Sequence, residues 1–471
     1  MTRQHLLEGP ILRSLLALAV PIVMANVLQS AYQLIDAFWV GRLGGAAVAA
    51  VSVSTPVMFL TIALGAGLAV AGSTLIAQYF GAKNQHMVDH VAAQTLLMIV
   101  LVSVVLGALG FIAAPGLLRL MGVAPEVFTG ALGFMRVSFI GLVFNFFFFM
   151  FQSVMRGVGE AKLPVYIVLG TVILNAVLDP LFIFGWGPIP RTGVMGAALA
   201  TVGTQSLAAF VGLAVLLRGK HGIHLVWSDF VPDAAYIKRA FFLGFPASIE
   251  QSARALGLTV LTFLIATFGT LTMAAYGVGT TILQVVMIPA MGLAMAVSAL
   301  VGQNIGAGNI ERAARIGRLG ASLGFWILSV LGVVAFFTAP YLVAFFVPND
   351  ASVIREGAVF LRTMALSWGC IGAQFSLTGV LRASGNMVVA MVLTLVGQWV
   401  LQFPLAYVLS VHTTLGDRGI WIAFPIANAA IALITMAVYA KGDWKRTRLT
   451  EPEAVLTERV TEETLIDTGL R

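Results

Sequence analysis

The sequence predicts an all-α integral membrane protein in which twelve transmembrane helices form two pseudo-symmetric six-helix lobes. The first observation is composition: 59% of the residues are hydrophobic, 10% are charged, and the mean hydropathy is +0.97, whereas a soluble domain carries about 25% charged residues. The second is the number of apolar stretches of about 20 residues or more, the length that crosses a bilayer. They occupy residues 14–40, 47–77, 90–113, 126–155, 163–184, 193–217, 238–268, 273–302, 315–338, 356–381, 387–410 and 419–440.

The third observation is an internal repeat. Residues 67–84 (GLAVAGSTLIAQYFGAKN) match residues 292–309 (GLAMAVSALVGQNIGAGN) at ten of eighteen positions, a constant 225 residues apart. Six spans per half is an even number, so both halves enter the membrane in the same direction and form a parallel repeat, whose halves can rock against each other. The predicted divisions are lobes at 1–217 and 238–440, a linker at 218–237 and a disordered cytoplasmic tail at 441–471.

Lys and Arg residues are distributed unequally between the two sides of this bundle. Segments before odd-numbered spans and after even-numbered ones carry seventeen of them, including Arg156 and Arg382, and the opposite loops carry five. By the positive-inside rule, both termini are expected on the cytoplasmic side of the cell inner membrane. The net charge of +7 then reflects topology, and no nucleic-acid partner is expected. The N-terminal segment lacks a small-residue cleavage site and is interpreted as a retained first span.

Three acidic residues lie inside predicted spans and away from the tail and loops: Asp36, Asp179 and Glu250. A charged side chain at the bilayer centre costs about 2.5–3.5 kcal/mol or more, so such residues usually face a cavity and act there. Asp36 and Asp179 both fall in the outer half of the first lobe. Burial and a neighbouring like charge both favour the neutral form of a carboxyl group, so this pair is suited to taking up and releasing a proton. The alternatives are an interfacial acid beside Arg42 for Asp36, and a helix-end residue satisfied by local backbone for Asp179.

Two further spacings bear on these acids. The segment NAVLDPLFI (175–183) places Asn175 and Asp179 four residues apart, on one face of a helix. Pro180 removes a backbone hydrogen bond and leaves carbonyl groups that water or a cation could use. In the seventh span, Arg254 follows Glu250 by one turn, so a self-neutralised ion pair is expected there ahead of a coupling role.

The remaining motifs predict no catalytic or metal site. HMVDH (86–90) sets two histidines one turn apart but lacks a third convergent ligand, and no Walker loop is present, so neither an enzyme nor a cofactor is expected. The aromatic run FNFFFFMFQS (144–153) surrounds its helix, so its rings are expected in the core or in lipid. Cys370 is the only cysteine and can form no internal disulfide. The glycines of the second span, at 65, 67 and 72, are interpreted as close-packing positions ahead of bending points.

These segments together resemble the multidrug and toxic compound extrusion (MATE) family. The resemblance covers about residues 10–440 and implies a secondary active multidrug efflux transporter that exports cationic amphipathic compounds in exchange for cations, by alternating access. The segments that carry it are PIVMANVLQSAYQLIDAFWVG (21–41), QYFGAKN (78–84), RGVGEAK (156–162), NAVLDPLFI (175–183), QNIGAGN (303–309) and RASGN (382–386).

The resemblance also implies site residues. In the branch with acids in the N-terminal lobe, the positions that match are Asp36, Asn175, Asp179 and Thr201, with Gln29 as a polar cavity residue and Pro21 as the bending proline of the first span. The sodium-type branch has an acid in the tenth span, eleven residues before its arginine, and this chain has Ile371 there. Protons bound in the N-terminal lobe are therefore favoured, with sodium at the same four side chains as the alternative.

The expected partners are small cationic drugs or toxins and membrane lipid, and the chain is expected to act as a monomer. The alternative transporter is a lipid-linked oligosaccharide flippase, which would favour several arginines in its cavity to hold a pyrophosphate. Apart from the cations already counted for topology, only Arg136, Arg254 and Arg362 fall near or inside predicted spans. A passive channel comes third, because paired membrane acids favour coupling.

Overall fold

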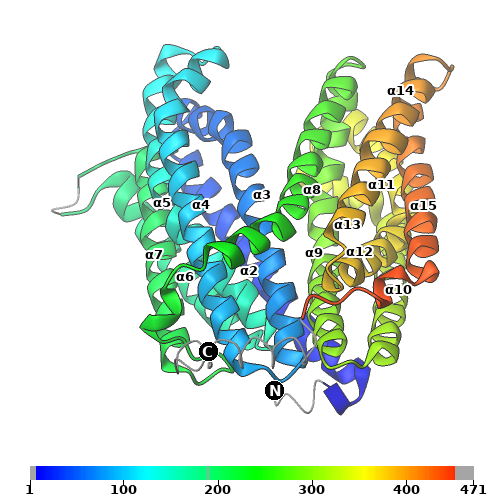
Figure 1. The fold of residues 1–471 in the computed structure, drawn as a ribbon. Coiled ribbons are helices and arrows are strands. Elements are labelled where there is room, and N and C mark those ends of the chain that lie inside the picture. Colours follow the sequence, from blue (N-terminus) through cyan, green and yellow to red (C-terminus); the bar gives the residue numbers. More distant parts are fainter. Residues whose placement is uncertain (1–6, 188–189, 451–471) are drawn as a thin grey trace, which may run out of the picture.

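The computed structural model describes residues 7–187 and 190–450, and its helices follow the predicted spans (Figure 1). In this part of the chain, eleven helices are long and apolar enough to cross a membrane, the bent pair α11–α12 makes a twelfth, and there is no β-strand. The predicted fold class is confirmed.

The spans are α2 (Ile11–Gly41), α3 (Gly45–Gly81), α4 (Gln85–Leu120), α5 (Pro125–Gly157), α6 (Lys162–Phe184), α7 (Val194–Arg218), α8 (Ala234–Ala266), α9 (Thr270–Gly306), α10 (Ile310–Phe346), α11 (Ala351–Ala365) with α12 (Trp368–Ala383), α13 (Met387–Leu395) with the π-helical η2 (Val396–Gln402) and α14 (Phe403–Val411), and α15 (Asp417–Lys441). The elements η1 (Trp227–Phe230) and η3 (Asp443–Lys445) are short 3-10 turns.

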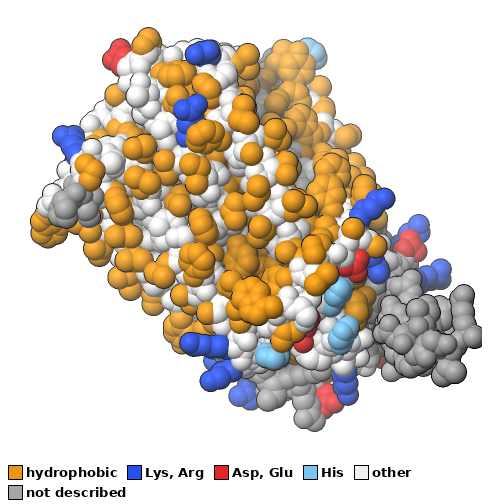
Figure 2. Space-filling model, turned by 60° about the vertical axis from the view of Figure 1, so that its left-hand side comes forward, with side chains coloured by type: hydrophobic (Ala, Val, Ile, Leu, Met, Phe, Trp, Pro, Cys, Tyr) orange, Lys and Arg blue, Asp and Glu red, His pale blue; other side chains and the backbone are white. Residues whose placement is uncertain are grey.

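The outer surface of the bundle is apolar over most of its height. Figure 2 shows hydrophobic side chains spread across one face, with Lys and Arg mainly at its margins. Leu109, Ile112, Phe263 and Phe337 lie on helices and are each at least 60% exposed. Soluble monomers rarely expose continuous apolar surface of this extent. The chain is therefore an integral membrane protein.

Two spans of the C-terminal half depart from a straight α-helix. α11 and α12 meet at a 49° bend, where Ser367 Oγ donates to Met364 O at 3.0 Å and accepts from Asn428 Nδ2 at 3.0 Å. The eleventh span contains the π-helical turn η2, a feature that often marks functional positions. Gln398 in this turn donates its side-chain amide to the backbone oxygen of Arg254 at 3.2 Å. Side-chain hydrogen bonds thus accompany both departures.

The first helix of each half packs against both halves. Leu15 and Leu18 at the start of α2 belong to an apolar core formed with residues of α9 and α12. Tyr236 and Ala240 at the start of α8 belong to the core of the N-terminal half. In Figure 1, α8 accordingly runs obliquely upward across the N-terminal half towards the C-terminal half. The boundary that the sequence predicts at residue 238 falls inside this crossing helix.

A seam between the halves is formed by the repeated motif at the ends of α3 and α9. Gln78 Nε2 donates to the last backbone oxygen of α12 at 2.8 Å, and its repeat mate Gln303 donates to the last backbone oxygen of α5 at 2.8 Å. A Cβ on Gly81 would overlap the backbone oxygen of Gln303, and a Cβ on Gly306 would overlap that of Gln78. Each copy of the motif therefore contacts the other, and only glycine permits this approach.

Residues 443–450 are folded, and Arg448 and Leu449 bond across this seam, which corrects the prediction of disorder for the start of the tail. Arg448 Nη2 donates to the backbone oxygen of Gly306 at 2.5 Å, and the Leu449 N–H donates to Gln78 Oε1 at 2.8 Å. The physical reason is that the seam presents acceptors which the donors of this polar segment satisfy, and composition alone does not reveal them. The rest of the predicted tail lies outside the described residues.

Candidate functional site

Four polar side chains from three helices of the N-terminal half meet in one place, which we call the acid cluster: Asp36 on α2, Asn175 and Asp179 on α6, and Thr201 on α7. Thr201 Oγ1 donates to Asp36 Oδ2 at 3.3 Å, and Asn175 Nδ2 donates to Asp179 Oδ1 at 3.0 Å. Asp36 also lies within interaction distance of Asp179 and Asn175. Both of these α6 side chains are fully buried. The structure therefore brings together all four residues named from the sequence.

Three oxygen atoms of the acid cluster lack a hydrogen-bond donor among the residues that the structure describes. They are Asp36 Oδ1, Asn175 Oδ1 and Asp179 Oδ2, and all three are buried. An unsatisfied buried acceptor costs about 1–3 kcal/mol, more when it is charged. The residues present therefore suit a proton or a small cation: a proton would turn one of these acceptors into a donor, and a cation could bind more than one of them.

The observed contacts fit neither of the alternative roles considered for the two acids, an interfacial acid beside Arg42 or a helix-end residue bonded to local backbone. The Arg42 guanidinium lies over the rings of Phe38, at 4.7 Å, and Trp39, at 5.4 Å, and forms no ion pair with Asp36 among the described residues. Asp179 bonds to the side chain of Asn175 and not to local backbone. Both acids are therefore members of one cluster.

Tyr32 is a neighbour that the sequence analysis missed. Its hydroxyl lies 2.6 Å from Thr204 Oγ1, and its side chain is only 3% exposed. Tyr32 stands one turn before Asp36, and Thr204 stands one turn after Thr201, so this second contact repeats the α2–α7 pairing one turn deeper. The four-residue spacing from Asp36 was the available signal, but a tyrosine in an apolar span is ordinary.

Pro21 and Gln29 occupy α2 without bonding to the acid cluster. Pro21 lies inside α2, which continues as one helix from Ile11 to Gly41. Gln29 is half-buried, seven residues before Asp36. No hydrogen bond in the described part of the chain joins either side chain to the cluster. Their roles stay predictions.

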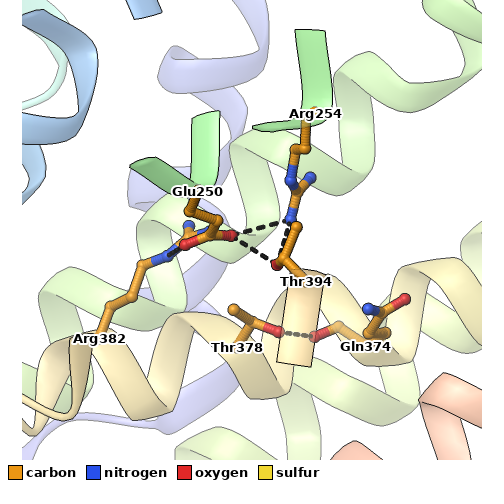
Figure 3. A network of polar contacts seen from close by, with 6 residues as sticks. All are labelled: Glu250, Arg254, Gln374, Thr378, Arg382 and Thr394. Carbon is orange, nitrogen blue, oxygen red and sulfur yellow. Dashed lines mark hydrogen bonds and ion pairs between the residues drawn. The ribbon is translucent and has the colours of Figure 1, made fainter. Parts of the chain in front are cut away.

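Glu250 is the centre of a second buried network, in the C-terminal half (Figure 3). Arg254 Nη2 lies 3.0 Å from Glu250 Oε1, the ion pair expected from the sequence. Arg382 Nη2 lies 2.5 Å from the same oxygen, its Nε lies 3.3 Å from Oε2, and Thr394 Oγ1 donates at 2.9 Å. One fully buried carboxylate thus joins two guanidinium groups from α8 and α12 with a hydroxyl from α13.

Arg382 corrects one detail of the charge count. The sequence places it among the cations that indicate the cytoplasmic side, but its side chain is only 15% exposed and pairs with Glu250. The two residues are 132 positions apart, so no local spacing reveals the pair. Ile371, the position of the missing acid, lies in an apolar core cluster. In the Glu250 network both carboxylate oxygens are therefore engaged, and no second acid lies at position 371.

The HMVDH segment anchors the connection between the halves. Asp89 Oδ1 accepts from the His224 backbone N–H at 2.9 Å and from Gln85 Nε2 at 3.0 Å. His90 Nε2 lies 3.4 Å from Asp233 Oδ2. These contacts attach the linker to α4. Across residues 7–187 and 190–450, no group of three His, Cys, Asp or Glu side chains could hold a metal ion.

Twelve apolar spans in two repeated halves, joined at a seam and carrying buried acids in one half, define a membrane transporter. The family model MatE matches residues 21–181 and 246–408, and the chain belongs to this family. It is 32% identical to the probable multidrug resistance protein YoeA of Bacillus subtilis (strain 168), over 93% of this chain and 95% of that protein.

Two further similarities also extend over most of the chain. The chain is 26% identical to the FAD transporter of Shewanella oneidensis, over 92% of this chain and 95% of that protein. Its structure is similar to that of a multidrug resistance MATE family transporter of the MOP superfamily in an outward-facing conformation, with a TM-score of 0.88 and 26% identity over 96% of this chain and 99% of the other. The recognition of the family from sequence motifs is confirmed.

Proposed function

We propose that this protein is a secondary active multidrug efflux transporter that exports cationic amphipathic compounds in exchange for protons, by alternating access. We place it in the cell inner membrane with both termini in the cytoplasm, because the Lys and Arg distribution favours that orientation. Family membership and the similarity to YoeA support the drug-efflux part of the proposal. The acid cluster supports the coupling part.

The observation that carries the coupling is the set of three unsatisfied oxygens in the acid cluster. A proton added to Asp36 or Asp179 converts one acceptor into a donor for a facing oxygen. Its release restores two like charges in an apolar lobe, which favours separation of α2 from α6. Proton occupancy is thereby linked to the packing of the helix that reaches both halves.

Sodium at the same four side chains is the alternative coupling ion, since carboxylate, amide and hydroxyl oxygens all suit hard cations. We favour protons because the Thr201 hydroxyl and the Asn175 amide already direct their donors at the carboxyl groups. A proton completes that arrangement without turning either donor away. In the second half, the Glu250 carboxylate is occupied by arginines and has no acid beside it at position 371.

Alternating access is supported by where the halves touch. Besides the seam at Gln78 and Gln303, Ser248 Oγ on α8 donates to the Leu64 backbone oxygen on α3 at 2.7 Å. In Figure 1 the two halves lie side by side in the lower part and diverge in the upper part. With the termini in the cytoplasm, this arrangement is the outward-facing state, and opening the seam would produce the opposite one.

The proposal is tested by transport of a fluorescent cation into inverted membrane vesicles, with imposed proton and sodium gradients applied separately. We expect a proton gradient to drive uptake, and Asp36→Asn and Asp179→Asn each to reduce it by about tenfold or more, since each removes a proton site. Asp443→Asn, at a side chain that is 66% exposed, is the matched control and should transport normally.

Three outcomes would reject parts of this assignment. Undiminished uptake in both cluster variants would remove the acid cluster from coupling. Uptake driven by sodium alone would replace the ion, and uptake that needs ATP without an ion gradient would reject secondary transport. The flippase alternative gains no support from the arginines, because Glu250 pairs with Arg254 and Arg382, and Arg136 lies over the Phe111 ring at 4.8 Å.

A further inference from the structure

A groove of about 700 Å³ runs along the outer face of the C-terminal half, away from both the seam and the acid cluster. Its walls are α10 and α15, which lie near the outer edge of that half in Figure 1. Its floor is α12, which packs against both walls. Small side chains at Ala314, Ala321, Ala373 and Ala440 leave the space between the walls open.

The groove has a cationic mouth and an apolar interior. Arg318 on α10 and Lys445 in η3 lie towards the end of the bundle where α10 begins and α15 ends. Trp326, which is 62% exposed, lies two turns beyond Arg318 on α10, and Met436, which is 49% exposed, lies one turn before Tyr439 on α15. Arg318 is eight residues into its helix, about 12 Å from the start.

Fixed contacts hold the mouth in shape. The Tyr439 hydroxyl donates to the Ala314 backbone oxygen at 2.9 Å and so ties α15 to α10. Trp444 is buried, stacks on Tyr439 at 5.3 Å, and donates its indole N–H to the Tyr439 backbone oxygen at 3.0 Å. Lys445 follows this anchored tryptophan directly, with its Nζ 6.0 Å from the indole ring. The cation is therefore presented by a rigid turn.

The cations at the mouth have no acidic partner in the described part of the chain. Asp443, the acid of the same turn, pairs with Lys441 at 3.2 Å. Elsewhere in the described ranges, no carboxylate forms an ion pair with Arg318 or Lys445. Two exposed cations therefore remain available to an anion at the membrane margin, next to the apolar interior of the groove.

We propose that this groove is a binding site for an anionic phospholipid. Basic pockets between transmembrane helices are suited to anionic head groups, and each Lys or Arg near the surface contributes to their attraction. The acyl chain fits the apolar part between Trp326 and Met436, which a soluble anion would leave unused. With the topology proposed above, the lipid belongs to the cytoplasmic leaflet. The site itself requires only that the chain spans a membrane.

The test is native mass spectrometry of the purified full-length protein in detergent, with phosphatidylglycerol and phosphatidylcholine of identical acyl chains. We expect the wild type to retain phosphatidylglycerol about tenfold more strongly than phosphatidylcholine. Arg318→Gln combined with Lys445→Gln should bring the two lipids close to equal retention. Arg218→Gln combined with Lys220→Gln, two exposed cations at the end of α7 in the other half, is the matched control and should keep the preference.

A second arm separates head group from tail. Trp326→Ala should weaken retention of both lipids while leaving their ratio unchanged. Inorganic phosphate alone should neither stabilise the protein nor displace phosphatidylglycerol at equal concentration; if it does, the phospholipid assignment fails. An unchanged lipid ratio in the double variant also overturns the proposal. Should the double variant not fold, Lys445→Gln alone carries the same test. None of these readouts depends on transport, so they stand apart from the proposed efflux function.

Discussion

The carboxyl groups buried in the two halves differ in how completely their oxygens are satisfied. Both Glu250 oxygens are engaged by Arg382, and one of them also by Arg254 and Thr394. In the acid cluster, one oxygen of Asp36 and one of Asp179 have no hydrogen-bond donor within residues 7–187 and 190–450. A satisfied ion network stabilises one arrangement, whereas unsatisfied acceptors respond to an added ion. We therefore expect changes at these acids to have different consequences.

Replacement of Glu250 should lower stability. Glu250→Gln leaves the buried guanidinium groups of Arg254 and Arg382 near one another without a counter-charge. Breaking a buried ion pair in this way costs about 3–5 kcal/mol, which thermal unfolding followed by tryptophan fluorescence in detergent would detect. Glu311→Gln is the control, because that side chain is 93% exposed and its ion pair with Arg315, at 3.8 Å, lies in solvent-accessible surface. Equal melting temperatures for the two variants would contradict a structural role for the network.

The Thr201 hydroxyl should matter for transport and not for folding. Thr201→Val keeps the side-chain shape but removes the donor to Asp36 Oδ2. A hydrogen bond to a charged group is worth about 1.5–3 kcal/mol, so we expect proton-driven uptake to fall by about tenfold or more. Thr201→Ser retains the hydroxyl and should restore most of the activity. Indistinguishable uptake by the Val and Ser variants would remove this hydroxyl from the mechanism.

Sequence spacing identified the buried acids but only some of their partners. Asn175 and Arg254 were visible because each lies one helical turn from its acid. Arg382 and Tyr32 were not predicted, because the first is far from Glu250 in sequence and the contact of the second is to another helix. Partners on separate helices depend on how those helices pack, and no local period encodes that.

At the scale of helices, glycine determines how closely neighbouring spans approach. In α3, Gly65 faces the Phe146 ring, Gly67 faces the Ser248 backbone and Gly72 faces the Met150 sulfur. These contacts confirm the interpretation of the second-span glycines as close-packing positions. The apolar run at 144–153 likewise contributes buried rings to the N-terminal core. What a one-dimensional pattern did not reveal was which helix each glycine meets.

Another close crossing joins α10 to α12. A Cβ on Gly324 would overlap the Gly372 backbone oxygen, and a Cβ on Gly372 would overlap that of Gly324. Gly372→Ala should therefore force the helices apart and cost about 1–3 kcal/mol of stability. Gly170→Ala in α6 meets nothing within 4 Å and is the control, expected to be neutral or slightly stabilising. Thermal unfolding of both variants in one detergent decides the question.

At the scale of the whole molecule, the two halves are related by the repeat but are not independent bodies. Gly67 on α3 meets Ser248 on α8, and its mate Gly292 on α9 meets Val23 on α2. Both contacts cross between halves, through the two helices that pack on both cores. The repeat in the sequence predicted two lobes correctly in kind. It could not predict this exchange, because identical spacings describe separate and interlocked halves equally well.

A bulky residue at the seam should shift the molecule away from this closed arrangement. Gly306→Val would collide with the Gln78 backbone oxygen, which cannot move without displacing α3. Cysteines introduced as His86→Cys on α4 and Glu311→Cys on α10, in a Cys370→Ala background, would carry spin labels. Pulsed electron resonance between the labels then measures the distance between the two halves. We expect longer distances and slower uptake than in the parent. Gly203→Val, where an added Cβ meets nothing within 4 Å, is the control and should leave the distance and the uptake rate unchanged. If Gly306→Val gave the same distance as Gly203→Val, the seam would not hold the halves together.

The short polar segment across the seam has a practical consequence for anyone handling this protein. Arg448 contacts the C-terminal half and Leu449 contacts the N-terminal half, so the segment bridges both. A reporter or affinity tag that replaces the chain directly after α15 would remove that bridge, whereas a tag joined beyond residue 450 would retain it. Preparations clipped by a protease within this segment would differ from intact ones in resting conformation, and dose–response curves from the two should not be pooled.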